Sequence, residues 1–482
     1  MSLGLNGPET HRAASAGELI RGILEAGAAE GVSSRTGGLL LAYLLHVHTG
    51  RLVCWIGPDN EAAEAAAREL TYFLGAAEQT LLIFPGLEVS PYRGLSPHPD
   101  VASRRAVALA QLAKGFSGVL VTTVDAAVTR TVAPDEFGAR CRELFMGEAL
   151  ERDALIQELR SRGYVREEPV SGPGEFSFRG GIVDVFSPHE NWPARVEFFG
   201  DRIESLRLFD PETQRTVRLT PAYRIVPMRE LTPHPEEVRL WHEEAPRRWG
   251  EVCFAERLQE IFQFTGHGEL FNGFEFLLPL VLPLQGTLFD YLTGGEEAPV
   301  ILLEEPEDLL RRANSLWEEE SKNFEESNRA GEPALPPETF FLHPDKLREA
   351  LSGMGTVISL ERISTSPKPS VALDLRPNLS YRGRFQEFLR DLEEDRREGM
   401  VQVLVMRSRG MRDRILEILA EYDVGWGVPC ESFRESLSHG LSATVGNVES
   451  GFSSRSLGLR LITEDEIFGP REQRRTPVPK TE

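Results

Sequence analysis

Residues 174–211 read GEFSFRGGIVDVFSPHENWPARVEFFGDRIESLRLFDP and carry the densest β-strand pattern in the chain. Two β-rich runs, Arg195–Phe199 and Arg202–Phe209, flank the dipeptide Gly200-Asp201, and a two-residue loop of this kind is typical of a hairpin. Gly180-Gly181 either closes a second hairpin or kinks one long strand, and we favour the hairpin. That hairpin would place one set of side chains on one face (Phe176, Phe178, Val183, Val185) and a second set on the other (Arg179, Asp184). The pattern predicts a small antiparallel α+β domain.

The sequence on either side of this domain indicates an α/β fold. Short apolar runs at Arg51–Ile56, Leu81–Phe84 and Gly118–Thr123 alternate with helical patterns, as in a parallel sheet. We therefore predict a helicase-like parallel-sheet domain that is interrupted by the α+β domain and followed by a second small α/β domain. The predicted parts are residues 1–125 and 218–370 for the interrupted domain, 126–217 for the insertion, 371–469 for the small domain and 470–482 for a basic tail. Within the interrupted domain, residues 321–338 are expected to form a loop.

Composition narrows the function classes. The chain has 482 residues, with 75 acidic and 53 basic side chains and a net charge of −22. A wide nucleic-acid footprint is disfavoured, because it would need a basic face to displace counterions. The cysteines at positions 54, 141, 253 and 430 have no metal-ligand or redox spacing. We expect reduced thiols in a cytoplasmic protein, no metal, and no membrane span, because no apolar stretch approaches about 18 residues.

A glycine-rich stretch invites comparison with a nucleotide-binding P-loop. GVSSRTGGLL, residues 31–40, precedes a helical pattern, but a P-loop needs GxxxxGK[ST]. Counted from Gly31, the last three motif positions hold Thr36, Gly37 and Gly38, and no Gly-Lys dipeptide occurs anywhere in the chain. We interpret these residues as a degenerate nucleotide site without a cofactor or catalytic residues.

Two acidic residues end another predicted strand, VILLEE, at residues 300–305. Glu304 and Glu305 occupy the place of a Walker-B acid pair and are assigned to the same degenerate site. A structural alternative is that they cap the helix that follows, since acidic residues stabilise a helix N-terminus.

Several motifs resemble one protein family. GEFSFRGGIVDVFSP (174–188) and ARVEFFGDRIESLRLFDPETQRT (194–216) resemble the module shared by the excision-repair protein UvrB and the Mfd family of transcription-repair coupling factors. Three other stretches resemble Mfd more closely, namely PGLEVSPYRGLSPHPDVASRR (85–105), GFEFLLPLVLPLQGTLFDYL (273–292) and GFSSRSLGLRLITEDEIFG (451–469). The missing P-loop lysine agrees with Mfd, whose UvrB-like module is degenerate, whereas UvrB has an intact P-loop.

The resemblance implies a recruitment function without catalysis. Members of the family are longer, so the chain would be an N-terminal part that lacks the polymerase-binding domain and the DNA-translocase motor, together with the ATP and Mg that the motor uses. RNA polymerase and duplex DNA would be partners of those absent domains, while the inserted domain would bind UvrA. Arginines of the family's UvrA contact match Arg166 and Arg179, and a third arginine of the UvrB pattern is Ser177 here. The expected site is Arg166, Glu175, Phe176, Ser177, Phe178 and Arg179.

Two other functions remain open at this point. One is an ATP-dependent DNA enzyme that works on its own, which the helicase-like scaffold and Glu304-Glu305 suggest. The other is direct binding of damaged DNA, which the acidic charge of the chain disfavours.

Overall fold

The computed structural model describes residues 9–75, 80–250, 272–295, 297–363 and 370–469. Its centre is one sheet of twelve strands in the order β19-β20-β18-β22-β21-β17-β1-β16-β15-β2-β4-β3. From β17 to β3 every neighbouring pair is parallel. The strands of this half are β1 (Ala28–Val32), β2 (Val53–Gly57), β3 (Leu81–Phe84), β4 (Val119–Thr123), β15 (Val300–Glu304), β16 (Thr356–Glu361) and β17 (Val371–Pro377).

Burial on both faces explains why the central strands β2, β4 and β15 are mostly apolar. All five residues of β2, VCWIG, are buried, as is usual for a parallel strand covered by helices on both sides. The covering helices are α1 (Glu9–Ala26), α2 (Arg35–Thr49), α3 (Asn60–Leu74), α4 (Pro99–Leu112), α5 (Val124–Val128), α12 (Pro306–Ala330) and α13 (Pro344–Gly353). Asp59 caps the N-terminus of α3, because its carboxylate accepts a hydrogen bond of 2.8 Å from the Ala62 amide.

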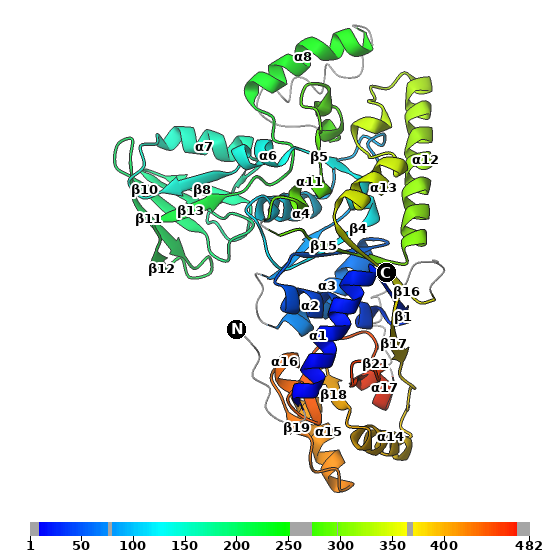
Figure 1. The fold of residues 1–482 in the computed structure, drawn as a ribbon. Coiled ribbons are helices and arrows are strands. Elements are labelled where there is room, and N and C mark those ends of the chain that lie inside the picture. Colours follow the sequence, from blue (N-terminus) through cyan, green and yellow to red (C-terminus); the bar gives the residue numbers. More distant parts are fainter. Residues whose placement is uncertain (1–8, 76–79, 251–271, 296, 364–369, 470–482) are drawn as a thin grey trace, which may run out of the picture.

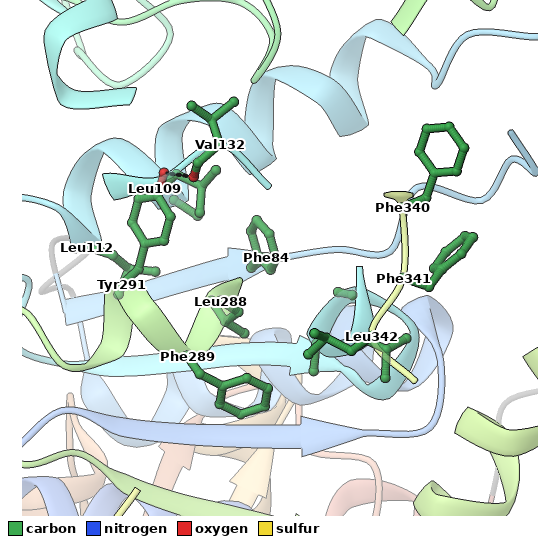
Figure 2. Packing of buried hydrophobic residues seen from close by; sticks show 14 of the residues in the cluster. Phe84, Leu109, Leu112, Val132, Leu288, Phe289, Tyr291, Phe340, Phe341 and Leu342 are labelled. Atoms are coloured by element: carbon green, nitrogen blue, oxygen red, sulfur yellow. Dashed lines mark hydrogen bonds between the residues drawn. The ribbon is translucent and has the colours of Figure 1, made fainter. Parts of the chain in front are cut away.

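One large apolar cluster packs where the chain resumes the α/β fold after the insertion. Figure 2 shows members of this cluster that come from distant parts of the sequence, including Phe84, Leu109 of α4 and Phe340. Tyr291 of α11 (Leu288–Leu292) is buried, and its hydroxyl donates a 2.8 Å hydrogen bond to the Val132 carbonyl. The remaining elements of this part are β5 (Arg130–Thr131), α6 (Pro134–Arg140), α8 (Pro235–Trp249), η3 (Phe274–Phe276), η4 (Leu278–Leu280), β14 (Gly286–Thr287) and η5 (Pro337–Thr339).

Helix α12 corrects one prediction. Residues 321–338 were expected to form a loop, yet α12 continues to Ala330. The last turns of α12 are polar in composition, yet Glu320 and Asn323 are buried. Glu320 accepts a 2.6 Å hydrogen bond from the Ser90 hydroxyl, and Asn323 donates a 3.1 Å hydrogen bond to Glu320. A helix whose buried face is polar gives no apolar periodicity in the sequence.

Residues 371–469 extend the same sheet. β17 pairs parallel with β1 through residues 371–375 and antiparallel with β21 (Phe452–Ser454) through residues 376–377, so the sheet continues from one part into the other. Phe433 packs edge-to-face on Phe73 of α3, with ring centroids 4.9 Å apart, and the Tyr72 hydroxyl lies 2.7 Å from the Thr444 hydroxyl. The other elements are β18 (Val401–Met406), β19 (Val428–Pro429), β20 (Leu441–Val445), β22 (Leu459–Thr463), α14 (Phe385–Arg397), α15 (Arg409–Glu421), α16 (Phe433–Ser436) and α17 (Glu464–Phe468).

The inserted domain is a six-stranded sheet in the order β12-β11-β10-β9-β8-β7, which projects from the side of the molecule (Figure 1). Both predicted hairpins are present, since β8 pairs antiparallel with β9 and β10 with β11. Helix α7 (Arg152–Ser161) buries Leu155 and Leu159 against one face of this sheet. The strands are β7 (Val165–Arg166), β8 (Glu175–Arg179), β9 (Ile182–Val185), β10 (Ala194–Phe198), β11 (Ile203–Phe209) and β12 (Thr216–Leu219), and β6 (Arg142–Phe145) pairs with β13 (Ala222–Ile225) beside them. The predicted fold class, an α/β protein with an inserted antiparallel domain, is confirmed.

Candidate functional site

The short strand β7 presents Arg166 at one edge of the inserted sheet. Both residues of β7 are exposed, and β7 pairs parallel with β8 so that Arg166 lies opposite Phe176. The Arg166 guanidinium sits 4.1 Å from the centroid of the Phe178 ring, which is half-buried. The aromatic ring attracts the guanidinium electrostatically, and this attraction holds the positive charge in one position at the surface. Val165 beside it adds an exposed apolar side chain.

Arg179 is the last residue of β8, directly before the glycine turn. It is exposed, and Gly180 takes a positive φ of 58° that favours glycine. Because side chains alternate along a strand, Arg179 extends from the opposite face to Phe178. Arg166 and Arg179 therefore lie on opposite faces of the β7–β8 edge, which we define as residues 165–166 and 175–179.

Three of the six residues predicted for this site, namely Phe176, Ser177 and Glu175, have structural roles. Phe176 is fully buried among the residues that pack on α7, so the expectation that it contacts a partner is wrong. Ser177 is mostly buried and lies opposite Asp184, which forms two 2.7 Å hydrogen bonds with Arg195. Alternation of strand residues could be read from the sequence, but which face was covered could not.

Glu175 holds the preceding loop. Its carboxylate accepts hydrogen bonds from the Ser171 amide at 2.7 Å and the Gly172 amide at 2.9 Å. Partial burial acts to raise its pKa, but these hydrogen bonds together keep the pKa of Glu175 below its ordinary value. Its side chain is thus committed to the loop that leads into β8.

One residue near this edge was not predicted. Arg152, at the start of α7, donates a hydrogen bond to the Gly180 carbonyl and pairs with Asp153. It brings a further cation to the β8–β9 turn. Sequence reasoning missed it because nothing in the helix pattern shows which strand the first turn of α7 reaches.

Three of the six residues assigned to the degenerate nucleotide site, Gly38, Glu304 and Glu305, meet in space. Glu304 and Glu305 at the end of β15 line one small cavity together with Gly38, Arg35 and Arg362. Burial raises the pKa of Glu304, although nearby Arg35 opposes the shift. Glu305 stands at the N-cap position of α12, but its carboxylate accepts hydrogen bonds from the Arg362 amide and side chain, at 3.2 and 2.9 Å, and makes no capping bond.

The start of α2 is packed against protein where a P-loop would hold phosphate. A Cβ atom added at Gly37 would lie 2.8 Å from Leu375 of β17. The Thr36 hydroxyl is buried and donates a 2.6 Å hydrogen bond to the Glu69 carboxylate. Gly31 has a positive φ of 74° and lies against the backbone of Asp374. These contacts fill the side of the helix start that faces β17, whereas Arg35 and Gly38 line the cavity described above.

Two family profiles match parts of the chain. The UvrB interaction domain matches residues 143–231, and the D3 domain of MFD matches residues 396–467. A transcription-repair-coupling factor of Myxococcus xanthus is 31% identical over 92% of this chain and 39% of its own length. The chain belongs to the Mfd family. Further relatives with the same name come from Escherichia coli, at 29% identity over 90% of the chain, and Bacillus subtilis, at 25% over 86%.

The chain corresponds to the N-terminal region of Mfd. It spans about two-fifths of the length of the curated relatives that it matches, since 39% and 37% of the first two are covered. The UvrB interaction domain coincides with most of the inserted sheet, and D3 with the strands beyond β17. Among the helices that the structure describes, none is long and apolar enough to cross a bilayer.

Proposed function

We propose that this chain recruits UvrA through the β7–β8 edge, with Arg166 and Arg179 as charged contacts. The observation that carries the proposal is the exposed Arg166 held over Phe178, inside the segment that matches the UvrB interaction domain. Arginine offers a planar fork that suits carboxylates and is enriched among residues that dominate interface energies. The relatives are named for coupling transcription to repair, and we place UvrA recruitment within that process.

The contact surface in this proposal is narrower than the sequence pattern suggested. Phe176, Ser177 and Glu175 support the edge from within, whereas Val165, Arg166, Phe178 and Arg179 form its outer surface. Because the two arginines lie on opposite faces, we propose that UvrA straddles the edge of the sheet.

The test measures binding of purified UvrA to the immobilised chain. We expect the double variant Arg166→Ala/Arg179→Ala to bind at least tenfold more weakly than wild type. A matched control, Arg311→Ala/Arg329→Ala, removes two exposed arginines from α12. This control should bind UvrA with the affinity of wild type. Unchanged affinity of the first variant would reject the site.

We further propose that residues 31–38 and Glu304–Glu305 have no nucleotide chemistry. The support is the contact between Gly37 and Leu375, together with the use of Thr36 and Glu305 in internal bonds. An ATPase assay with and without duplex DNA tests this. Turnover that disappears in Glu304→Gln would restore the alternative of an ATP-dependent enzyme.

A further inference from the structure

The other edge of the inserted sheet is also exposed. β12 is the outermost strand, and all four of its residues are exposed, with Val217 at 47% and Leu219 at 68% (Figure 1). Native proteins rarely leave an apolar edge strand uncovered, because its free backbone groups can pair with another chain. β12 lies four strands away from β8, so this edge is separate from the β7–β8 edge.

The register shows which backbone groups are free. Arg218 lies opposite Leu208 and Leu219 opposite Arg207, and the Thr220 amide donates a 3.0 Å hydrogen bond to the Leu206 carbonyl. In an antiparallel pair alternate residues bond to the partner strand, so Arg218 and Thr220 face β11. Leu219, which lies between them, directs its amide and carbonyl groups outward. The register then shifts, since Phe209 pairs with Thr216, and Val217 is the extra residue of a bulge. Leu219 therefore combines outward backbone groups with an exposed apolar side chain.

The same edge carries cations without a counter-ion. Arg215 and Arg218 are exposed, and neither forms an ion pair within the part of the chain that the structure describes. The arginines of the neighbouring strands differ, because Arg207 pairs with Glu197 and Arg195 with Asp184. In a chain with a net charge of −22, Arg218 on the edge strand and Arg215 just before it form a local positive site.

The apolar surface continues beyond the end of β12. Phe145 and Met146 are about half-exposed, and the Met146 amide donates a 3.0 Å hydrogen bond to the Pro221 carbonyl. Residues 145–146 thus lie beside the chain that leaves β12. We define residues 145–146 and 215–219 as the β12 edge.

We propose that the β12 edge is a second docking site, which takes an extended segment of a partner protein with alternating acidic and apolar residues. Such a segment would add a seventh strand by bonding to the outward backbone groups of Leu219, as in other cases of strand addition. Its carboxylates would meet Arg215 and Arg218, and its apolar side chains would cover Leu219 and Met146. A second copy of this chain is a poor occupant, because pairing two β12 strands would bring like-charged arginines together.

The probe is a fluorescein-labelled peptide of sequence Asp-Val-Glu-Val-Asp-Val-Glu, and its anisotropy is measured against the full chain. We expect saturable binding that weakens at least tenfold when lysine replaces each acid in the peptide. N-methylation of alternate peptide amides should also abolish binding, because it removes the backbone bonds. Hydrogen exchange should slow at the Leu219 amide when the peptide is bound.

Variants of the chain decide whether this edge is responsible. Arg218→Glu/Leu219→Thr should lower peptide affinity at least tenfold, whereas the α12 variant Arg329→Glu should not change it. Binding that survives the β12 variant, binding of the N-methylated peptide, or no saturable binding would each overturn the proposal. Concentration-dependent dimerisation that the β12 variant removes would also overturn it in favour of self-pairing. UvrA affinity measured in the same variant should be unchanged, which separates this proposal from the recruitment proposal.

Discussion

Leu375 of β17 packs against Gly37 at the start of α2, so that a Cβ atom at position 37 would lie 2.8 Å from a Leu375 methyl carbon. Position 37 is where a P-loop would place its lysine. Leu375 is buried and cannot move away freely. The strand that joins the two halves of the sheet therefore also fills the space that a side chain at position 37 would need.

Restoring the lysine should harm the protein rather than revive nucleotide binding. We expect Gly37→Lys to lower the free energy of unfolding by about 1–3 kcal/mol, as overpacking of a core does, and to show no ATP binding by calorimetry. Gly17→Lys is the control, because a side chain at Gly17 in α1 meets nothing within 4 Å. That control should be neutral or slightly stabilising, since glycine disfavours helix. ATP binding by Gly37→Lys would contradict the packing argument.

Two phenylalanines of the inserted domain should respond in opposite ways to truncation. Phe176→Ala should cost about 3–5 kcal/mol of unfolding free energy, because it leaves a cavity in the core. Phe199 is 76% exposed at the β10–β11 turn, and Phe199→Ala should change stability by less than about 0.5 kcal/mol. Urea denaturation measures both, and equal costs would mean that Phe176 is not a core residue.

Arg166 and Phe178 should act as a unit in UvrA binding. A double-mutant cycle with Arg166→Ala and Phe178→Ala should give a coupling free energy of about 0.5–1 kcal/mol, the usual range for an exposed cation–π pair. Arg166→Lys should retain charge but lose the planar stacking, and bind UvrA between wild type and Arg166→Ala. Strictly additive effects would show that the stacking does not position Arg166 for binding.

Stability should fall in mildly acidic solution because of His242 on α8. Burial lowers the pKa of His242 from 6.5 to about 4. Between these two pH values the unfolded chain binds more protons at this histidine than the folded chain does. The contribution of His242 to the free energy of unfolding is therefore constant above about pH 6.5 and decreases as the pH falls towards 4. The loss should be on the order of 1 kcal/mol after allowance for partial solvent exposure. His242→Gln should flatten this slope in denaturation measured at several pH values, and an unchanged slope would assign it to other groups.

The sequence predicted those elements that a few neighbouring residues determine, such as tight turns and helix caps. The Gly200-Asp201 hairpin and the Asp59 cap depend on neighbouring residues and are present. β1, with the sequence AAEGV, has little intrinsic strand preference and forms because it lies between β16 and β17. Such a strand is created by its neighbours, so a single sequence gives no local sign of it.

The candidate site was predictable in its position but not in its orientation. Strand alternation correctly separated Phe178 from Arg179, yet it could not tell that α7 covers the face with Phe176. It also could not show that Arg166 would reach the Phe178 ring, because β7 and β8 are joined by a loop of eight residues with its own path. Burial and pairing across such loops are tertiary properties.

β17 pairs with β1 through residues 371–375 and with β21 through residues 376–377, so the strands of D3 and those of the α/β core lie in one sheet. Moving D3 away from the core would break the β17–β21 pairing and separate Phe433 from Phe73. We therefore expect a force on D3 to be transmitted to the core through β17 and not to be absorbed at a flexible hinge.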